Sequence, residues 1–265
     1  RAKQLVDFNA KIQSGISAIV KKGQKIYDEK YHPAYYSKSN PKKCTLVLTE
    51  GDSAVAFVRS GVKGMSDESQ KYWGWFPLKG KPLNVRDASP LAVSNNIELK
   101  KIASFMGLQT GKKYNTHEEL KSLNYGRIMI LSDADDDGYH IKGLIINYIH
   151  FYWPDLIKID GFICTLATAM YRAYIPVKNK QGVPQDALIF YTSKEYNIWK
   201  DQNYSKKWEI VYYKGLSTSS SSEASYYFSD KILPENLIGF KWDHDETDLS
   251  VPQPSVNVET EFYIT

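Results

Sequence analysis

Four aspartates follow a hydrophobic segment within five residues, in the stretch RIMILSDADDDGYHIKG at positions 127–143. Asp133, Asp135, Asp136 and Asp137 repel one another unless a positive group is held among them. Carboxylate oxygens suit hard cations such as Mg²⁺, which keeps several waters and takes few protein ligands. Two such ions can clamp a phosphate during an in-line displacement. The stretch therefore predicts a magnesium site that acts on a phosphate ester.

Two apolar, β-branched segments predict the elements that position these acids. CTLVLT at 44–49 ends at Glu50, and RIMILSD at 127–133 leads into the aspartates. Each segment is typical of a buried parallel strand, and each is followed by a helical pattern, at 51–61 and 142–153. The order of strand, acidic turn and helix, occurring twice, predicts an α/β sheet.

Ligands of open parallel sheets lie beyond the carboxyl ends of the strands. If the two strands are neighbours, Glu50, Asp133, Asp135 and Asp137 converge on one crevice. An extended DADDD segment would turn Asp133, Asp135 and Asp137 to a common side and Asp136 away from it. We therefore expect four carboxylates around the metal.

The aspartates allow three other interpretations. The opening D-x-D-x-D-G matches a calcium loop, but that motif needs a preceding helix and a Glu at its twelfth position, which is Leu144 here. An aspartyl-phosphate phosphatase also places one Asp after a hydrophobic strand and a second two residues on, and this alternative stays open on the stretch alone. So does a solvated acidic turn without a ligand, which the repeated strand and helix context disfavours.

Composition sets the class of protein. The 265 residues are 42% hydrophobic and 24% charged, enough for one large domain or two small ones. No apolar segment is long enough to span a membrane, and the N-terminus lacks a secretion signal. The two cysteines, Cys44 and Cys164, give no disulfide framework and exclude a cysteine-based zinc site, which favours a reducing compartment.

Charge is unevenly distributed. Residues 1–43 carry ten Lys or Arg against three acids, whereas residues 231–265 carry two against seven. A basic N-terminal segment can track a polyanion or can be a solvated helix.

The start without Met indicates a fragment or a processed chain.

Hydrophobic periodicity and turn residues predict the remaining elements. They are a helix over 1–30, a linker over 31–43, a helix over 97–106, strands within 161–175 and 208–216, a serine-rich loop at 217–222 and an extended tail.

Five blocks of sequence occur in a particular order: TLVLTEGDSA at 45–54, FPLKGKPLNVRDA at 76–88, GLQTGKKY at 107–114, ILSDADDDGYHIKGLIINY at 130–148 and YYKGLSTS at 212–219. In this order they resemble the TOPRIM domain of type IIA DNA topoisomerases in their eukaryotic form. Several ordered blocks are more specific than any single motif. GLQTGKKY and LIINY argue against a bacterial-type gyrase subunit, the nearest rival within the family.

The resemblance implies an α/β, Rossmann-like TOPRIM fold, with a largely parallel sheet flanked by helices and a helical N-terminal connector. The implied divisions are a connector from an ATPase or transducer region at 1–43, the TOPRIM core at 44–164, an extension with YYKGLSTS at 165–229, and a connector toward a winged-helix domain at 230–265.

The resemblance also implies an activity. Such enzymes cut both strands of one DNA duplex through a tyrosine–phosphate bond, pass a second duplex through the break and reseal it, driven by ATP. Carried over by position, Glu50 and Asp133 would bind the Mg²⁺ nearest the chemistry, and Asp135 and Asp137 would support a second ion. Glu50 would also serve in proton transfer during religation. Mn²⁺ or Ca²⁺ could substitute in binding.

Contacts with DNA and with drugs follow from the same blocks. Residues implied to contact double-stranded DNA are Lys79, Lys81, Asn84, Arg86 and Lys214. Residues implied to contact drugs are Gly51, Asp52 and Lys79. Ordinary surface roles remain open for the lysines, as does a loop-bracing role for Asn84 and Arg86.

The sequence departs from the family at several points. Ser217 replaces a family glycine, which tolerates positive φ where serine does not. None of the 20 tyrosines follows an arginine, as the family's nucleophile does, and no G-x-x-x-x-G-K-[ST] phosphate loop is present. We therefore expect the parent protein to supply the tyrosine from its winged-helix domain and to bind ATP in another domain. The chain by itself should not cleave DNA.

The parent is expected to be a homodimer, nuclear if it is cellular. The departures also suit an enzyme of a large DNA virus, acting in the host cytoplasm or nucleus. Two alternatives from other classes remain. A stand-alone metal-dependent phosphotransferase or nuclease would turn over a phosphate ester alone, and a non-catalytic DNA-binding module would survive loss of Glu50.

Overall fold

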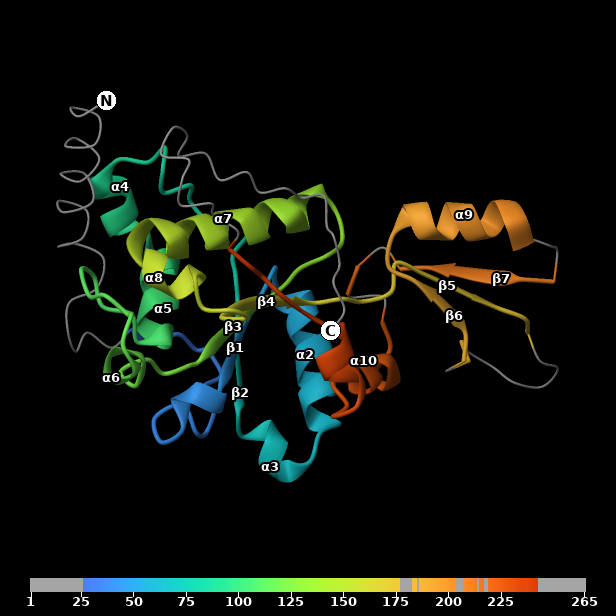
Figure 1. The fold of residues 1–265 in the computed structure, drawn as a ribbon, viewed down its shortest axis with the longest axis horizontal. Helices are drawn as coiled ribbons and strands as arrows, with labels where there is room; N and C mark the ends of the chain where they lie inside the picture. Colours follow the sequence, from blue (N-terminus) through green and yellow to red (C-terminus); the bar gives the residue numbers. More distant parts are fainter. Residues whose placement is uncertain are drawn as a thin grey trace.

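The computed structural model describes residues 26–176, 183–184, 186–203, 207–213, 215–216 and 219–242. They form a five-stranded sheet with helices on both faces and, to one side, a smaller three-stranded sheet (Figure 1). The predicted α/β class with a largely parallel sheet is confirmed.

The helices and strands follow one another in this order: η1 Pro41–Lys43, β1 Thr45–Thr49, α2 Asp52–Lys63, α3 Asp67–Gln70, β2 Trp73–Pro77, α4 Pro90–Asn95, α5 Ile97–Met106, α6 His117–Leu120, β3 Arg127–Leu131, α7 Asp136–Tyr152, α8 Pro154–Ile157, β4 Ile163–Leu166, β5 Tyr171–Tyr174, β6 Leu188–Phe190, α9 Ser193–Asn203, β7 Glu209–Tyr212, α10 Ser221–Tyr227, α11 Ile232–Asn236 and β8 Leu237–Gly239.

The larger sheet has the order β2-β1-β3-β4-β8. The first four strands are parallel, and β8 pairs with β4 in the antiparallel direction. Thr49 at the end of β1 is in register with Leu131 at the end of β3. The two segments that carry the predicted acids are therefore hydrogen-bonded neighbours whose carboxyl ends lie level.

Side chains alternate between two cores, one on each face of the larger sheet. Leu46 and Ile128 contribute to the core beneath α5 and α7. Val47 and Met129 point to the other core, which α2 and α10 cover. Burial of an aliphatic side chain of this size contributes about 1.5–3 kcal/mol. Because both faces are covered, the strands hold their carboxyl ends in fixed positions.

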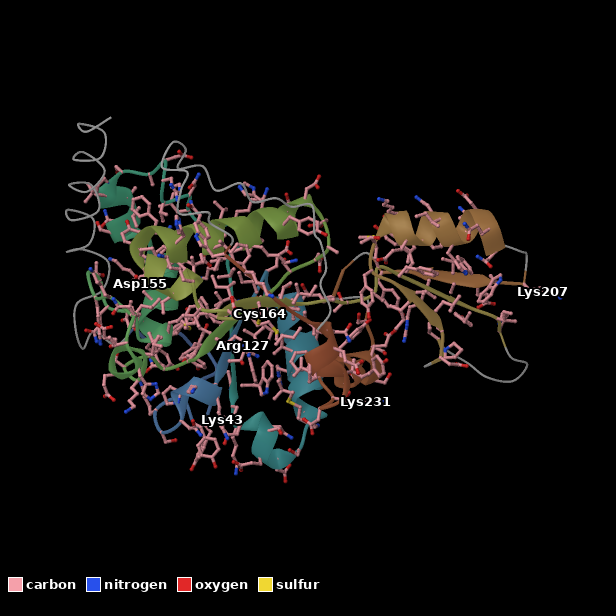
Figure 2. All side chains as sticks on the ribbon, in the orientation of Figure 1. Lys43, Arg127, Asp155, Cys164, Lys207 and Lys231 are labelled. Carbon is pink, nitrogen blue, oxygen red and sulfur yellow. The ribbon has the colours of Figure 1, made fainter. Side chains whose placement is uncertain are left out.

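The smaller sheet has the order β6-β5-β7 and is antiparallel. One face packs on α9 through an aromatic cluster that includes Phe190 and Tyr196. Figure 2 shows Lys207 at the end of this extension, far from Cys164 in the interior of the core. An ion pair of 3.2 Å between Arg172 Nη1 on β5 and Glu223 Oε1 on α10 ties the extension to the core.

The fold departs from three predictions. Residues 26–30, the described end of the helix predicted over 1–30, are not helical, whereas residues 31–43 contain turns and the short η1, as the predicted linker with Pro33 and Pro41 implies. The segment 73–77, for which no strand was predicted, is β2. The serine-rich loop was predicted to run to residue 222, but α10 already begins at Ser221, because Ser220 forms a capping box with Glu223.

Predictions for residues 1–25 and 243–265 lie outside the described residues. Within the described part of the chain, no helix has the length and hydropathy needed to cross a bilayer.

Candidate metal centre

The structure places Glu50 and Asp133 side by side at the carboxyl ends of β1 and β3. The backbone N–H of Glu50 donates to the carbonyl of Leu131, which extends the strand ladder by one residue. In return, Glu50 Oε2 accepts a hydrogen bond of 3.1 Å from the backbone N–H of Asp133. Both side chains are partly exposed. Two carboxylates from neighbouring strands therefore lie at one accessible edge of the sheet.

A loop from the end of the extension lies against Asp133. The carboxylate Oδ1 of Asp133 accepts a hydrogen bond of 2.8 Å from the backbone N–H of Leu216 in this loop. Gly215 lies so close that a Cβ at this position would overlap the Asp133 carboxylate. On the other side, a Cβ on Gly138 would overlap the Asp133 carbonyl. Two glycines thus allow backbone to enclose this aspartate.

The remaining aspartates do not form the extended segment expected from the sequence. Asp135 caps α7, with its Oδ1 accepting a hydrogen bond of 2.8 Å from the N–H of Gly138. Asp136 and Asp137 already belong to the first helical turn, where negative charge is favoured by the helix dipole. Asp137 pairs with Lys81, with 2.7 Å between Nζ and Oδ1. The alternation expected of an extended strand therefore ends at Asp135.

Electrostatics at this edge favour a bound cation. Burial raises the pKa of Glu50, the N–H of Asp133 opposes that shift, and the charges of Asp133, Asp135 and Asp137 raise the pKa further. Burial likewise lowers the pKa of the Lys142 ammonium on α7, against the charges of Glu50, Asp135 and Asp133. The acids attract a cation. Lys142 supplies only part of the positive charge, because it is half-buried.

The donor set fits Mg²⁺ in part. Mg²⁺ is typically held by one or two carboxylates together with waters and substrate phosphate, and Glu50 with Asp133 provide such a pair. Among the described residues, no group of three or more His, Cys, Asp or Glu side chains is arranged to hold a metal ion. Convergence of all four acids on a site for two metal ions therefore stays a prediction.

The loop after β2 contains both lysines implied to contact DNA. Lys79 is exposed, and its backbone N–H donates a hydrogen bond of 2.5 Å to Glu98 Oε1. Lys81 reaches the first turn of α7 through its ion pair with Asp137. This loop therefore borders the acidic edge.

Asn84 and Arg86 brace the same loop on α7. Asn84 Oδ1 accepts a hydrogen bond of 2.8 Å from Asn147 Nδ2. Arg86 Nε donates one of 2.5 Å to Asn147 Oδ1, and its Nη2 lies 2.8 Å from His150 Nδ1. These contacts give both residues a structural role, and a DNA contact for either stays a prediction.

Two of the three residues implied to contact drugs, Gly51 and Asp52, lie at the start of α2, and the third, Lys79, lies in the loop after β2. Gly51 is the N-cap of α2, and Asp52 Oδ2 lies 2.5 Å from Lys30 Nζ. Lys214 and Ser217 lie outside the described residues, so the predictions for them stay as they were.

Comparison with known families matches two models to this architecture. Residues 45–166 match the Toprim domain, and residues 172–253 match the C-terminal associated domain of TOPRIM. The chain contains a Toprim domain. The first match covers the larger sheet through β4, and the second begins within β5 of the extension.

Relatives of this Toprim protein are DNA topoisomerases. It is 42% identical over 235 residues to DNA topoisomerase 2 of Acanthamoeba polyphaga mimivirus, covering 88% of this chain and 18% of that protein. It is 44% identical over 211 residues to DNA topoisomerase 2 of Pisum sativum, covering 79% and 13%. DNA topoisomerase 2-alpha of Gallus gallus is 44% identical over 214 residues, covering 80% and 13%. The chain thus spans less than a fifth of these relatives' lengths.

A solved structure agrees with the Toprim assignment. The DNA-binding, cleavage and re-ligation domain of Plasmodium falciparum topoisomerase II superposes with a TM-score of 0.73 at 37% identity, covering 84% of this chain and 29% of that one. The predicted resemblance to type II topoisomerases and the TOPRIM fold are confirmed.

Sequence reasoning missed three contributors to the Toprim site. They are the backbone at Gly215 and Leu216, which encloses Asp133, and the half-buried Lys142. The block YYKGLSTS and the position of Lys142 in the turn after Asp137 were visible in the sequence. Which strand end each would approach depends on tertiary packing.

Proposed function

We propose that this Toprim domain forms the Mg²⁺-binding part of the DNA cleavage and religation centre of a type II topoisomerase. The observation that carries the proposal is the pairing of Glu50 with Asp133 at the level ends of β1 and β3. The names of the relatives and of the Plasmodium structure support the choice of DNA as substrate.

In this proposal Glu50 and Asp133 hold the ion, and Asp135 and Asp137 support a second one. The bound metal would stabilise the negative charge that develops on the scissile phosphate. The Leu216 N–H fixes the orientation of Asp133. As the family resemblance implies, Glu50 would also serve in proton transfer during religation.

Other parts of the reaction are assigned to the full-length protein. The tyrosine nucleophile would come from a winged-helix domain, ATP would bind in a separate domain, and two copies would form the DNA gate. Lys79, Lys81 and Lys214 would contact DNA phosphates. The eukaryotic and viral relatives suit a nuclear protein, or a viral one acting in its host.

Metal binding tests the proposal on the chain itself. Calorimetric titration with Mn²⁺ and Mg²⁺ should show at least about tenfold weaker binding for Glu50→Gln and Asp133→Asn. Asp160→Asn removes an exposed acid outside the site and serves as the matched control. Equal metal affinity in all four proteins would overturn the assignment of these ligands.

DNA cleavage tests it in the full-length protein. Covalent protein–DNA complexes on supercoiled plasmid should disappear in Glu50→Gln and Asp133→Asn while DNA binding is kept. Retained cleavage in both variants would reject the proposal. Turnover of a phosphate ester by the chain alone would favour a stand-alone phosphotransferase instead.

A further inference from the structure

The structure contains a cavity of about 540 Å³ beside β2, the edge strand of the larger sheet, and neither Glu50 nor Asp133 is among the residues that line it. It lies between α2, β2 and the segment that precedes η1. Its lining residues are Glu29, Lys30, Tyr31, His32, Asp52, Val55, Arg59, Val62, Lys63, Gln70, Trp75 and Pro77. Small-molecule sites commonly have volumes of about 300–1,000 Å³, so the cavity can hold a nucleotide-sized ligand.

The walls of the cavity are fixed by backbone contacts. His32 and Trp75 exchange two backbone hydrogen bonds of 2.9 Å, which attach the N-terminal segment to the edge of β2. On the opposite wall, Val55, Arg59 and Lys63 recur at four-residue spacing along α2 and therefore share one helix face. The cavity is thus bounded by a strand edge and a helix.

Two cations on this helix face lack protein partners. The side chains of Arg59 and Lys63 are exposed and form no hydrogen bond or ion pair with any described residue, although the Lys63 carbonyl accepts a hydrogen bond of 3.5 Å from Gln70 Nε2. The third cation, Lys30, is neutralised by Asp52 at 2.5 Å. The remaining acid, Glu29, also lines a smaller neighbouring cavity, so it lies at the boundary between the two. The α2 wall therefore has uncompensated positive charge.

An aromatic surface lines the same cavity as these cations. The His32 ring stacks on Trp75 with 4.0 Å between ring centroids and 11° between planes. Burial and the charge of Arg59 both lower the pKa of His32, and both residues line the cavity. An imidazole stacked on an indole is a flat surface on which a base can stack, and Arg59 and Lys63 line the same cavity as donors for a phosphate.

We propose that this cavity binds a phosphate-bearing ligand, with Arg59 and Lys63 contacting the phosphate and the His32–Trp75 stack contacting an attached base. A free nucleotide and the end of a nucleic-acid strand offer the same chemistry. The size of the cavity favours the free nucleotide. The inference does not depend on metal at Glu50 and Asp133.

Calorimetry on the 265-residue chain tests the proposal. EDTA is kept in all titrations, so that no phosphate is held through a metal ion. The probes are adenosine monophosphate, inorganic phosphate and a short DNA duplex. We expect the nucleotide to bind and its Kd to rise at least about tenfold in both Arg59→Gln and Lys63→Gln. Lys194→Gln, an exposed lysine on α9, is the matched control and should leave the Kd unchanged.

His32→Ala separates the two parts of the ligand. It should weaken binding of the nucleotide and leave binding of inorganic phosphate unchanged. Binding of the duplex alone, sensitive to Arg59 and Lys63, would assign the phosphate to nucleic acid rather than to a free nucleotide. The proposal is overturned if none of the three probes binds, or if Arg59→Gln and Lys63→Gln bind as the wild type does. Both side chains are exposed, so the variants should fold, and their thermal unfolding verifies it.

Discussion

Lys81 Nζ lies 2.7 Å from Asp137 Oδ1, which joins the loop after β2 to the first turn of α7. The hydrogen bond from Lys81 is the main reason why the pKa of Asp137 lies below its usual value. Both side chains are exposed, at 45% and 66%, so solvent screens the pair. The contact therefore affects charge at the acidic edge more than it affects stability.

Lys81→Gln should leave the urea midpoint of unfolding unchanged and should reduce the salt dependence of DNA binding. Loss of one phosphate contact lowers the slope of log affinity against log salt by about one. Fluorescence anisotropy of labelled duplex over a series of KCl concentrations measures that slope. Lys121→Gln breaks a comparably exposed ion pair with Glu118 and should leave the slope as it is. An unchanged slope in Lys81→Gln would remove Lys81 from the DNA contacts.

Gly215→Ala should weaken metal binding, because the added Cβ displaces the Asp133 carboxylate. We expect about tenfold lower Mn²⁺ affinity and a loss of about 1–3 kcal/mol in the free energy of unfolding. Gly143→Ala is the matched control, since a Cβ there meets nothing within 4 Å. In the interior of α7 it should stabilise by about 0.5–1 kcal/mol. Equal metal affinity in the two variants would contradict the role of Gly215.

Asp28→Asn should destabilise the fold by about 2 kcal/mol, because it leaves Lys101 without its charged partner. The pair has 2.5 Å between Nζ and Oδ2, and the side chains are only 13% and 9% exposed. Urea unfolding at pH 7 measures the difference. Lys71→Gln, which breaks an exposed pair with Glu68, should leave the urea midpoint unchanged. A similarly small effect of Asp28→Asn would show that the buried pair adds no stability.

The same pair predicts a pH dependence. Burial by itself raises the pKa of Asp28, but hydrogen bonds from Lys101 and Lys30 and the Lys101 charge bring it below the usual 3.8. A carboxyl with a lowered folded pKa stabilises above its unfolded pKa and loses that contribution as pH falls through the folded value. The stability difference between wild type and Asp28→Asn should therefore be full above about pH 5 and should shrink below 3.8. A difference that grows in acid would be the wrong sign for this account.

Arg172→Met should lower the free energy of unfolding by about 3 kcal/mol, because Glu223 would keep its charge inside the protein without a cation beside it. The hydroxyl of Tyr213 donates to the same Glu223 oxygen that Arg172 contacts. Adding Glu223→Gln removes that charge, so the double variant should lose less than the sum of the single losses. Urea unfolding of all four proteins measures the coupling, and strict additivity would show that the two residues act independently.

Periodicity predicted the parts of the fold that local sequence determines. Helix α5 runs from Ile97 to Met106 as expected, because Asn96 caps its start and Gly107 adopts the left-handed conformation after its end. The strands ending before Glu50 and Asp133 were clear because buried parallel strands are apolar throughout. Strand β2 was missed, since Gly74 and Pro77 are unfavourable in strands.

The sequence predicted which acids form the candidate site, but it did not predict how their side chains are arranged. Asp133 and Glu50 follow directly from the ends of strands, whereas Asp136 and Asp137 enter a helix because Asp135 caps it. The hydrogen bond between Leu216 and Asp133 joins residues 83 apart in the chain. Contacts of this kind depend on how α10 and the extension pack, which no local pattern encodes.

The pairing of β8 with β4 has a consequence for synthesis of the protein. Strand β4 ends at Leu166, and its antiparallel partner begins only at Leu237, after the extension and α10 have been made. On the ribosome, β4 must therefore wait with an unpaired edge until this later segment emerges. The larger sheet is therefore completed by a strand from outside its own continuous sequence.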